Sequence, residues 1–206
     1  MRLQIWMPAT IACLLSIAAC KQQPTERLNR VVVLPNYPSG SAVELLHNKL
    51  SLMGDDASWL LHLDTALTVT DSLQLFFNTP RRLRKDQKPD LEAMTQFRMR
   101  GRDQLLLVGS GSADSLRNKA VLINADSIQT IDLSTFYNRL KKEGIRDLNI
   151  EGLAAYQGGM ILTSRGNKGF RKNLLVFTSR DFFYRQDSAN ISITSVGVQT
   201  DTAFFN

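Results

Sequence analysis

Two glutamates, Glu92 and Glu151, are the residues best placed to do chemistry in this sequence, because each precedes a small residue at the start of an apolar run. As a pair, carboxyl groups about 5 to 10 Å apart could carry general acid–base catalysis. With Asp55 or Asp56, they could instead supply the oxygen ligands that Ca²⁺ prefers. A third interpretation is structural, with each carboxylate accepting hydrogen bonds from backbone amides where its strand begins. The sequence leaves all three open.

The remaining polar residues narrow the chemistry. Arg165 follows a strand-like run and could either pair with Glu151 or bind an anionic ligand through its guanidinium group. The chain has two histidines, His47 and His62, and no Gly-x-Ser-x-Gly motif. A Ser–His–Asp hydrolase and a histidine-rich zinc site are therefore not expected.

The N-terminus reads as an export signal. An apolar run ends in Ile17-Ala18-Ala19-Cys20, which has the small residues that a signal peptidase needs and a cysteine that would carry lipid. Residues 1–19 are thus predicted to be a lipoprotein signal peptide, Cys20 the lipidation site, and residues 20–29 a polar tether. Lys21 after the cysteine favours the outer membrane of the cell envelope. The competing interpretation is an ordinary secretory signal that contains a chance cysteine.

The formal net charge of +6 does not indicate nucleic-acid binding. The densest basic cluster, residues 81–85, stands in a turn-rich stretch without a DNA- or RNA-binding motif. Such runs are usually solvated surface, although a basic loop could also contact anionic headgroups. The charge favours an anionic ligand or partner over a cationic one.

Residues 30–206 are predicted to form an all-β domain, because short apolar or alternating runs are bounded by Gly, Asn, Asp, Ser or Pro. One short helix is expected around residues 133–142, where apolar residues from Leu133 to Leu140 recur at helical spacing and Gly144 can end the helix. The candidate strands cover residues 30–34, 42–46, 49–53, 59–64, 72–77, 92–98, 104–109, 119–124, 127–132, 152–156, 160–164, 173–178 and 189–196.

An internal repeat organises these strands. Three passages, from Pro38, Pro89 and Leu148, each place a polar residue beside a small one and continue as strand, turn and strand. A period of about 50 to 60 residues is typical of a β-propeller blade with insertions. The matching polar–small pairs are Ser39–Gly40, Glu92–Ala93 and Glu151–Gly152. In a propeller, Ser39, Glu92 and Glu151 would ring one end of the central channel.

Three stretches resemble a known group. "NIEGLAAYQGGMILTSRG", "PSGSAVELLHNKLSLMGDDASWLLHLD" and "LLLVGSGSADSLRNKAVLIN" are similar to blades of esterase-like, phytase-like bacterial β-propellers, and in particular to an uncharacterised lipoprotein branch. The resemblance spans residues 31–177 and implies four-stranded blades around a channel. A six-bladed ring needs roughly 270 residues, so the sequence predicts an incomplete propeller of three to four blades. C-terminal truncation of the domain at residues 30–206 is the favoured explanation, and an open arc and closure by a partner are the alternatives.

Two functions follow as expectations. The first is a lipid-anchored envelope propeller that binds a ligand or partner through its channel face, without assignable catalysis. The second is a cation-dependent hydrolase of esters or phosphoesters, in which Glu92 and Glu151 hold the metal. No cofactor is certain, and Ca²⁺ is the ion that the oxygen ligands would suit.

Overall fold

The computed structural model describes residues 30–37, 39–46, 48–113 and 115–197. It divides into two compact units, Met1–Val33 and Leu34–Asn206, and the fold below belongs to the second. Cys20, the signal peptide and the tether lie outside the described residues. No helix in the described part of the chain has the length and apolar character that crossing a membrane requires.

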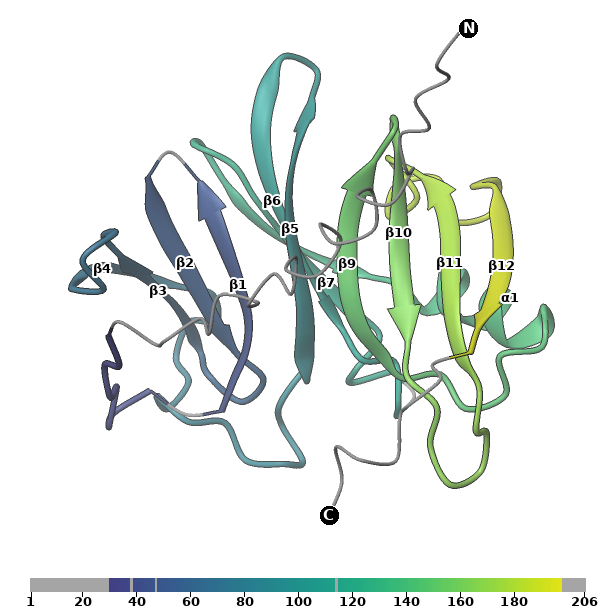
Figure 1. Cartoon of the computed structure of the whole chain (residues 1–206), viewed down its shortest axis with the longest axis horizontal. Helices are drawn as coiled ribbons and strands as arrows, with labels where there is room; N and C mark the ends of the chain where they lie inside the picture. The colour runs from purple at the N-terminus through teal and green to yellow at the C-terminus, as the bar shows by residue number, and fades with distance from the viewer. Residues whose placement is uncertain (1–29, 38, 47, 114, 198–206) are drawn as a thin grey trace, which may run out of the picture. The chain divides into compact units, whose positions relative to one another are not determined.

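The described residues of the second unit form three antiparallel sheets of four strands each and one short helix (Figure 1). Each sheet is a meander in which strands adjacent in sequence are paired. Sheet 1 holds β1 (Gly40–Leu46), β2 (Lys49–Gly54), β3 (Trp59–Leu63) and β4 (Val69–Gln74). Sheet 2 holds β5 (Leu91–Met99), β6 (Arg102–Gly109), β7 (Lys119–Ile123) and β8 (Ile128–Asp132). Sheet 3 holds β9 (Ile150–Tyr156), β10 (Gly159–Ser164), β11 (Asn173–Ser179) and β12 (Ile191–Val196).

The predicted all-β class and most of the strands are confirmed, and two segments differ. Residues 30–34 form no strand, and Val31 is 73% exposed. The strand expected at 72–77 is β4, which starts earlier, at Val69, and ends at Gln74. In the preceding turn the backbone N–H of Thr68 donates to the Asp64 carboxylate at 2.8 Å, a side-chain-stabilised turn that brings Val69 opposite Leu63.

The helix α1 (Ser134–Lys142) is confirmed between sheets 2 and 3 in sequence. Asp132 accepts a hydrogen bond from the N–H of Ser134 at 2.8 Å, which satisfies one donor of the first turn. The predicted apolar face is fully buried, and the Tyr137 hydroxyl donates to the carbonyl of Gly109 at 2.7 Å. The helix therefore packs its apolar face into the core and ties itself to the end of β6.

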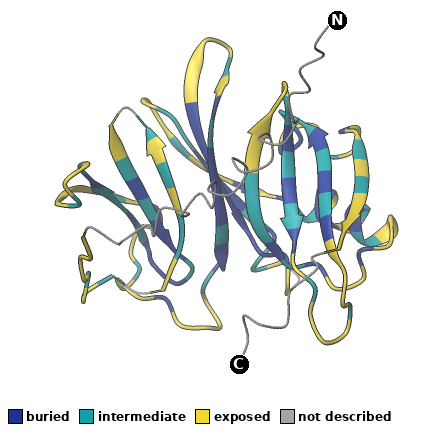
Figure 2. Ribbon diagram, viewed as in Figure 1, coloured by how far each residue is buried: buried dark blue, intermediate teal, exposed yellow. Residues whose placement is uncertain are grey.

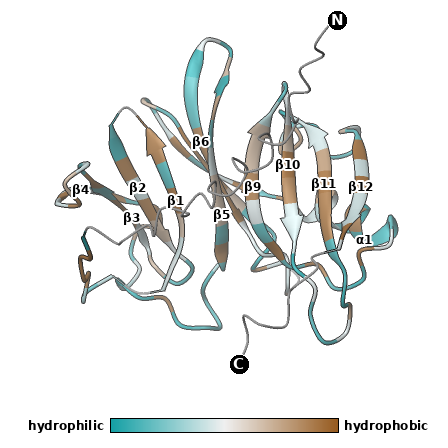
Figure 3. Ribbon diagram, in the orientation of Figure 1, coloured by the Kyte–Doolittle hydropathy of each residue, from teal (hydrophilic) through white to brown (hydrophobic). Residues whose placement is uncertain are grey.

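Sheet 2 has apolar residues on both faces, and each face packs against a different sheet. Alternation along β5 and β6 sends neighbouring residues to opposite faces, so both faces are buried in the middle of these strands (Figure 2). Buried and partly buried residues also alternate along β10, whose middle is hydrophobic (Figure 3). One core, between sheets 1 and 2, includes Met53, Leu60, Met94, Leu105, Leu107 and Val121. The other joins sheets 2 and 3 with α1 and includes Phe97, Leu106, Leu122, Phe136, Leu162, Val176 and Phe182.

The first strands of the three sheets are neighbours: β5 contacts both β1 and β9. Hydrogen bonds join them directly, since Gln96 Nε2 donates to the carbonyl of Leu45 at 3.0 Å and the N–H of Ala155 donates to Thr95 Oγ1 at 3.3 Å. Residues at the start of these strands are consequently brought together from three separate parts of the sequence.

Candidate functional site

Each first strand begins with the same irregularity. The pairing register shifts between Gly40 and Ala42, between Leu91 and Ala93, and opposite Glu151, so one residue bulges out of each ladder. The bulged residues are Ser41, Glu92 and Glu151. A bulge redirects a side chain at a strand end, which is a common device at binding sites.

Backbone hydrogen bonds confirm that these positions are equivalent. The N–H groups of Asp55, Ser110 and Arg165 donate to the carbonyls of Ser39, Asp90 and Asn149, at 3.0, 2.9 and 2.9 Å. Ser41 is therefore the residue of sheet 1 that is equivalent to Glu92 and Glu151. The prediction that Ser39 occupies this position was wrong by two residues. The spacings are 51 residues (92 minus 41) and 59 residues (151 minus 92), in agreement with the predicted period.

Glu92 is the most perturbed carboxyl group of the site. Burial, followed by the negative charges of Asp90, Glu151 and Asp55, raises its pKa from 4.5 to about 7, and a hydrogen bond from Ser41 opposes the rise. The structure thus brings Glu92 within electrostatic range of the predicted residues Glu151 and Asp55. A carboxyl group that titrates near neutrality can act as an acid, a base or a proton-controlled contact.

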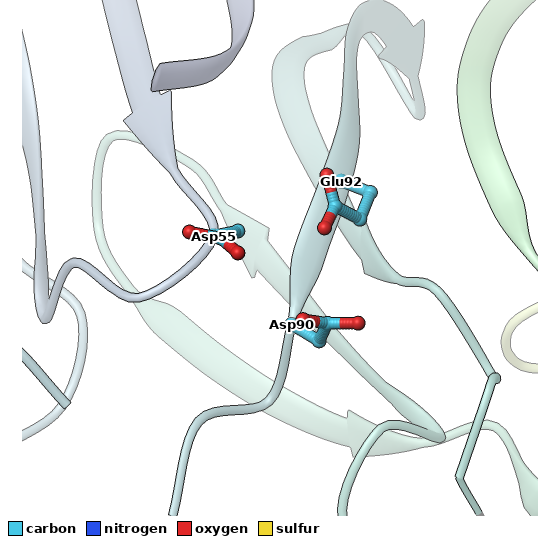
Figure 4. Close-up of side chains that lie close together, drawn as sticks. All are labelled: Asp55, Asp90 and Glu92. Atoms are coloured by element: carbon cyan, nitrogen blue, oxygen red, sulfur yellow. The ribbon is translucent and has the colours of Figure 1, made fainter. Parts of the chain in front are cut away.

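Asp55, Asp90 and Glu92 bring one carboxylate oxygen each within 4.8 Å of the others (Figure 4). The ammonium group of Lys88 lies among them, paired with Asp55 and with Asp90 Oδ1, the latter at 2.7 Å. Burial lowers the pKa of Lys88, but its hydrogen bonds to these two carboxylates outweigh burial and raise the pKa overall. Lys88 is therefore a built-in cation that neutralises part of the cluster.

Asp90 is the best-satisfied member of the cluster. Its carboxylate is 8% exposed and accepts from Ser110 Oγ at 2.6 Å and from Arg117 at 3.0 Å. Burial raises the pKa of Asp90, but its bonds to Lys88 and Ser110 and the charge of Arg117 hold it below the usual value. Asp90 is thus a fixed negative charge that fastens the beginning of β5 to the end of β6.

The other predicted residues lie near the cluster and have partners of their own. Asp56 pairs with Arg82 at 2.7 Å. Glu151 accepts from Asn149 Nδ2 at 2.8 Å and pairs with Arg165 at 3.0 Å, which is one of the two roles expected for Arg165. Arg165 is 66% exposed, so this pair is worth at most about 1 kcal/mol.

A pocket of about 600 Å³ opens beside the cluster. Its wall contains four carboxyl groups and five cationic groups, so it is strongly polar and slightly positive when all are ionised. Among the described residues, Asp55 Oδ1 and Asp56 Oδ1 are buried without a hydrogen-bond partner. The lining residues are Asp55, Asp56, Arg82, Leu83, Arg84, Lys85, Lys88, Asp90, Glu92 and Arg117.

Sequence reasoning missed Lys88, Asp90, Ser110 and Arg117. Lys88 and Asp90 stood at the end of the basic stretch interpreted as solvated surface, yet their side chains are 15% and 8% exposed. Arg84, in the same stretch, is 70% exposed, so only part of that stretch is solvated. The available signal was the repeat itself, in which Asp90 precedes β5 as Asn149 precedes β9.

The histidine that the structure describes is not part of this site. His62 on β3 lies opposite Ser51 on β2, and the Ser51 hydroxyl contacts His62 Nδ1 at 3.1 Å. Burial lowers the pKa of His62, which favours the neutral ring. Ser51 is only 2% exposed, which leaves its hydroxyl inaccessible to a substrate. His47 lies outside the described residues.

Comparison with known proteins identifies a family but no activity. No curated protein matches the chain in sequence. A family profile does match residues 36–200, which include all three sheets and the whole of the carboxylate cluster. The chain therefore belongs to the family of unknown function DUF6929.

Proposed function

We propose that this chain is a lipid-anchored protein of the cell envelope, built as part of a β-propeller, that binds a small anionic ligand where the first strands of its sheets begin. The observation that carries the proposal is the convergence of three equivalent bulges, at Ser41, Glu92 and Glu151, beside a polar pocket. Repeated strand ends that meet around one opening are typical of propeller binding sites.

The propeller arrangement is supported by the order within and between the sheets. Each sheet is a four-stranded meander, the first strands are neighbours, and the bulge recurs at the same place in each. The resemblance to esterase-like, phytase-like propellers also supports the propeller arrangement. The predicted lipidation of Cys20 supports the location in the cell envelope.

The charges of the pocket support an anionic ligand. When Glu92 is protonated, the three aspartates of the lining face five cationic groups. Asp55 and Asp90 are already engaged by Lys88, so the excess positive charge is supplied by the arginines and Lys85. Among the described residues Lys85 has no ion-pair partner, and it is exposed at the pocket rim.

The second candidate, a cation-dependent hydrolase, is favoured by the three clustered carboxyl groups and the two unpartnered carboxylate oxygens. These are ligands of the kind that Ca²⁺ takes. A metal would, however, have to compete with Lys88 for Asp55 and Asp90 and remove the proton from Glu92. The anionic ligand needs neither change, and it is therefore the stronger candidate.

Thermal unfolding in the presence of citrate, phosphate or Ca²⁺ separates the two functions, because a ligand that binds the folded state raises the midpoint. We expect a rise with an anion, which is lost in Arg117→Gln but kept in the exposed control Arg146→Gln. A rise with Ca²⁺ together with turnover of a model ester or phosphoester would favour the hydrolase instead. No response to any probe would count against both.

The anchor is tested in cells. Cys20→Ser should move the protein from the membrane fraction to the soluble fraction, because lipid is then missing. Cys13→Ser, within the predicted signal peptide, serves as the matched control and should remain in the membrane fraction. Membrane association that survives Cys20→Ser would rule out lipidation at this residue as the anchor.

A further inference from the structure

The two faces of each sheet are different, and β5 shows the difference most clearly. Met94 lies in the core shared with sheet 1, whereas Ala93 and Phe97 lie in the core shared with sheet 3. We name the side of a sheet that carries Met94 or its equivalents the front face, and the opposite side the back face. Sheet 2 thus packs its front face on sheet 1 and its back face on sheet 3.

The bulges give the equivalent residues in the other sheets. Ala42, Ala93 and Gly152 are equivalent because each follows its bulged residue directly. Val43, Met94 and Leu153 are equivalent because each lies two residues after the bulged residue. Leu153 packs in the core between sheets 2 and 3, and Ala42 packs in the core between sheets 1 and 2. Each sheet therefore packs its front face on the back face of the preceding sheet.

This rule leaves two apolar faces uncovered by any sheet in the described residues. The front face of sheet 1 carries Val43 and Leu45, which are 59% and 51% exposed. Beside them, Leu50, Leu52 and Leu61 lie on the same face by strand register and are half-buried. Exposed apolar groups gathered on one face, rather than scattered, are typical of an interaction surface.

The back face of sheet 3 is the counterpart. Strand register places Ile161 and Phe177 opposite one another, on the side of Gly152 and Ala154. Leu175 lies on the same side, and all three large residues are partly exposed. This face has small residues at the start of its first strand and large ones on the next two strands, as the back face of sheet 2 does with Ala93, Leu106 and Leu122.

We propose that the back face of sheet 3 in one copy of the chain binds the front face of sheet 1 in a second copy, and that the reciprocal contact closes a ring of two chains and six sheets. The inference rests on the propeller arrangement proposed above. A second copy carries both complementary faces, and the packing that it would use already occurs twice within one chain. A contact between unlike faces must either close into a ring or continue as an open filament.

The front face of sheet 1 also has room to accept a facing side chain. A pocket of about 300 Å³ lies on the outer part of this sheet, lined by Tyr37, Trp59, Leu61 and Val69 among others. Arg81 stacks over the Trp59 ring at 4.6 Å, and the Tyr37 hydroxyl donates to the carbonyls of Leu52 and Trp59. The aromatic walls are therefore held in place before any partner arrives, which lowers the entropy cost of binding.

Paired variants test the proposal on the purified protein, with mass measured by light scattering and sedimentation equilibrium over a range of concentrations. Val43→Lys places a charge on the apolar front face of sheet 1, and Phe177→Lys places one on the back face of sheet 3. The control Thr130→Lys adds the same charge to an exposed position of sheet 2. We expect the unaltered protein and the control to have the mass of two chains. Each face variant should have a dissociation constant for the dimer at least tenfold higher.

Mixing the two face variants gives the decisive result. Val43→Lys keeps an unaltered back face of sheet 3, and Phe177→Lys keeps an unaltered front face of sheet 1. These two faces can form one intact contact, so a two-chain species should reappear in the mixture. If only Val43→Lys dissociates, like faces pair and the proposal is overturned; assemblies longer than two chains overturn ring closure.

An unaltered protein that stays monomeric at all concentrations also overturns the inference. If that monomer still binds citrate or phosphate at the pocket, the proposed function stands without the dimer. A protein that dimerises but shows no response to citrate or phosphate would support the dimer and count against the proposed ligand binding.

Discussion

Replacing Glu92 by glutamine should stabilise the protein at alkaline pH more than at acidic pH. The folded protein raises the pKa of Glu92 from 4.5 to about 7, mainly through burial and then through the charges of Asp90, Glu151 and Asp55. The folded state therefore holds the Glu92 proton more tightly than the unfolded state. Stability from this group is fully present below pH 4.5 and is lost as the pH rises to about 7.

The size of the effect follows from the pKa difference. A difference of about 2.5 at about 1.36 kcal/mol per pKa unit sets an upper bound of about 3.4 kcal/mol. Glu92 is only partly buried, so solvent screening reduces this value, and we expect about half of it. Glutamine is neutral at every pH and keeps an oxygen that can accept from Ser41. Between pH 5 and pH 8.5, the advantage of Glu92→Gln over the unaltered protein should grow by about 1 to 2 kcal/mol.

Urea unfolding at pH 5, 7 and 8.5 measures this growth directly, and the matched control is Glu143→Gln, an exposed carboxyl at the end of α1. The control should change stability by less than about 0.5 kcal/mol at each pH. A carboxyl titration followed by NMR should give the Glu92 midpoint near 7. A Glu92→Gln difference that is the same at all three pH values, or that shrinks as the pH rises, would refute the reasoning.

Three further substitutions test the packing around the site by urea unfolding. Lys88→Met should destabilise the protein by about 3 kcal/mol, because Asp55 loses its cation and Asp90 keeps only Arg117, and adding Asp55→Asn should recover part of the loss. Tyr137→Phe removes a fully buried hydroxyl that donates to Gly109 and should cost about 1 kcal/mol; no change would mean that water replaces the bond. Gly109→Ala should cost about 1 to 3 kcal/mol, because its Cβ would lie 2.5 and 2.7 Å from two backbone oxygens, whereas Gly40→Ala meets only an ordinary contact at 3.7 Å and should be nearly neutral.

The strands and their repeat could be predicted from the sequence because they depend on local patterns. Alternating apolar residues and turn residues recur with the sheets, and the helical spacing from Leu133 to Leu140 marked α1 correctly. The exact equivalence of Ser41 could not be found this way. A bulge changes the count of residues along one strand without any change in composition, so aligning polar–small pairs selected Ser39.

The carboxylate cluster was predicted only in part. Glu92 was identified from its position at a strand start and Asp55, as an alternative to Asp56, from its residue type, and the structure places both in the cluster. Lys88 was missed because a lysine within a charged run is usually solvated, and its burial depends on Asp55, which is 33 residues away. Long-range ion pairs of this kind leave no local pattern in a single sequence.

One proton links the structure of the site to the choice between its two proposed functions. When Glu92 is protonated, the pocket carries one negative charge fewer, which favours an anion. When Glu92 is ionised, the three carboxyl groups carry one more negative charge and compete better for a divalent cation. Anion binding should therefore weaken as the pH rises through about 7, and Ca²⁺ binding should strengthen over the same range. Because Glu92→Gln is locked in the neutral form, it should remove the contribution of this group to either dependence, so the sign of the pH effect in the unaltered protein identifies which ligand the cluster was built to hold.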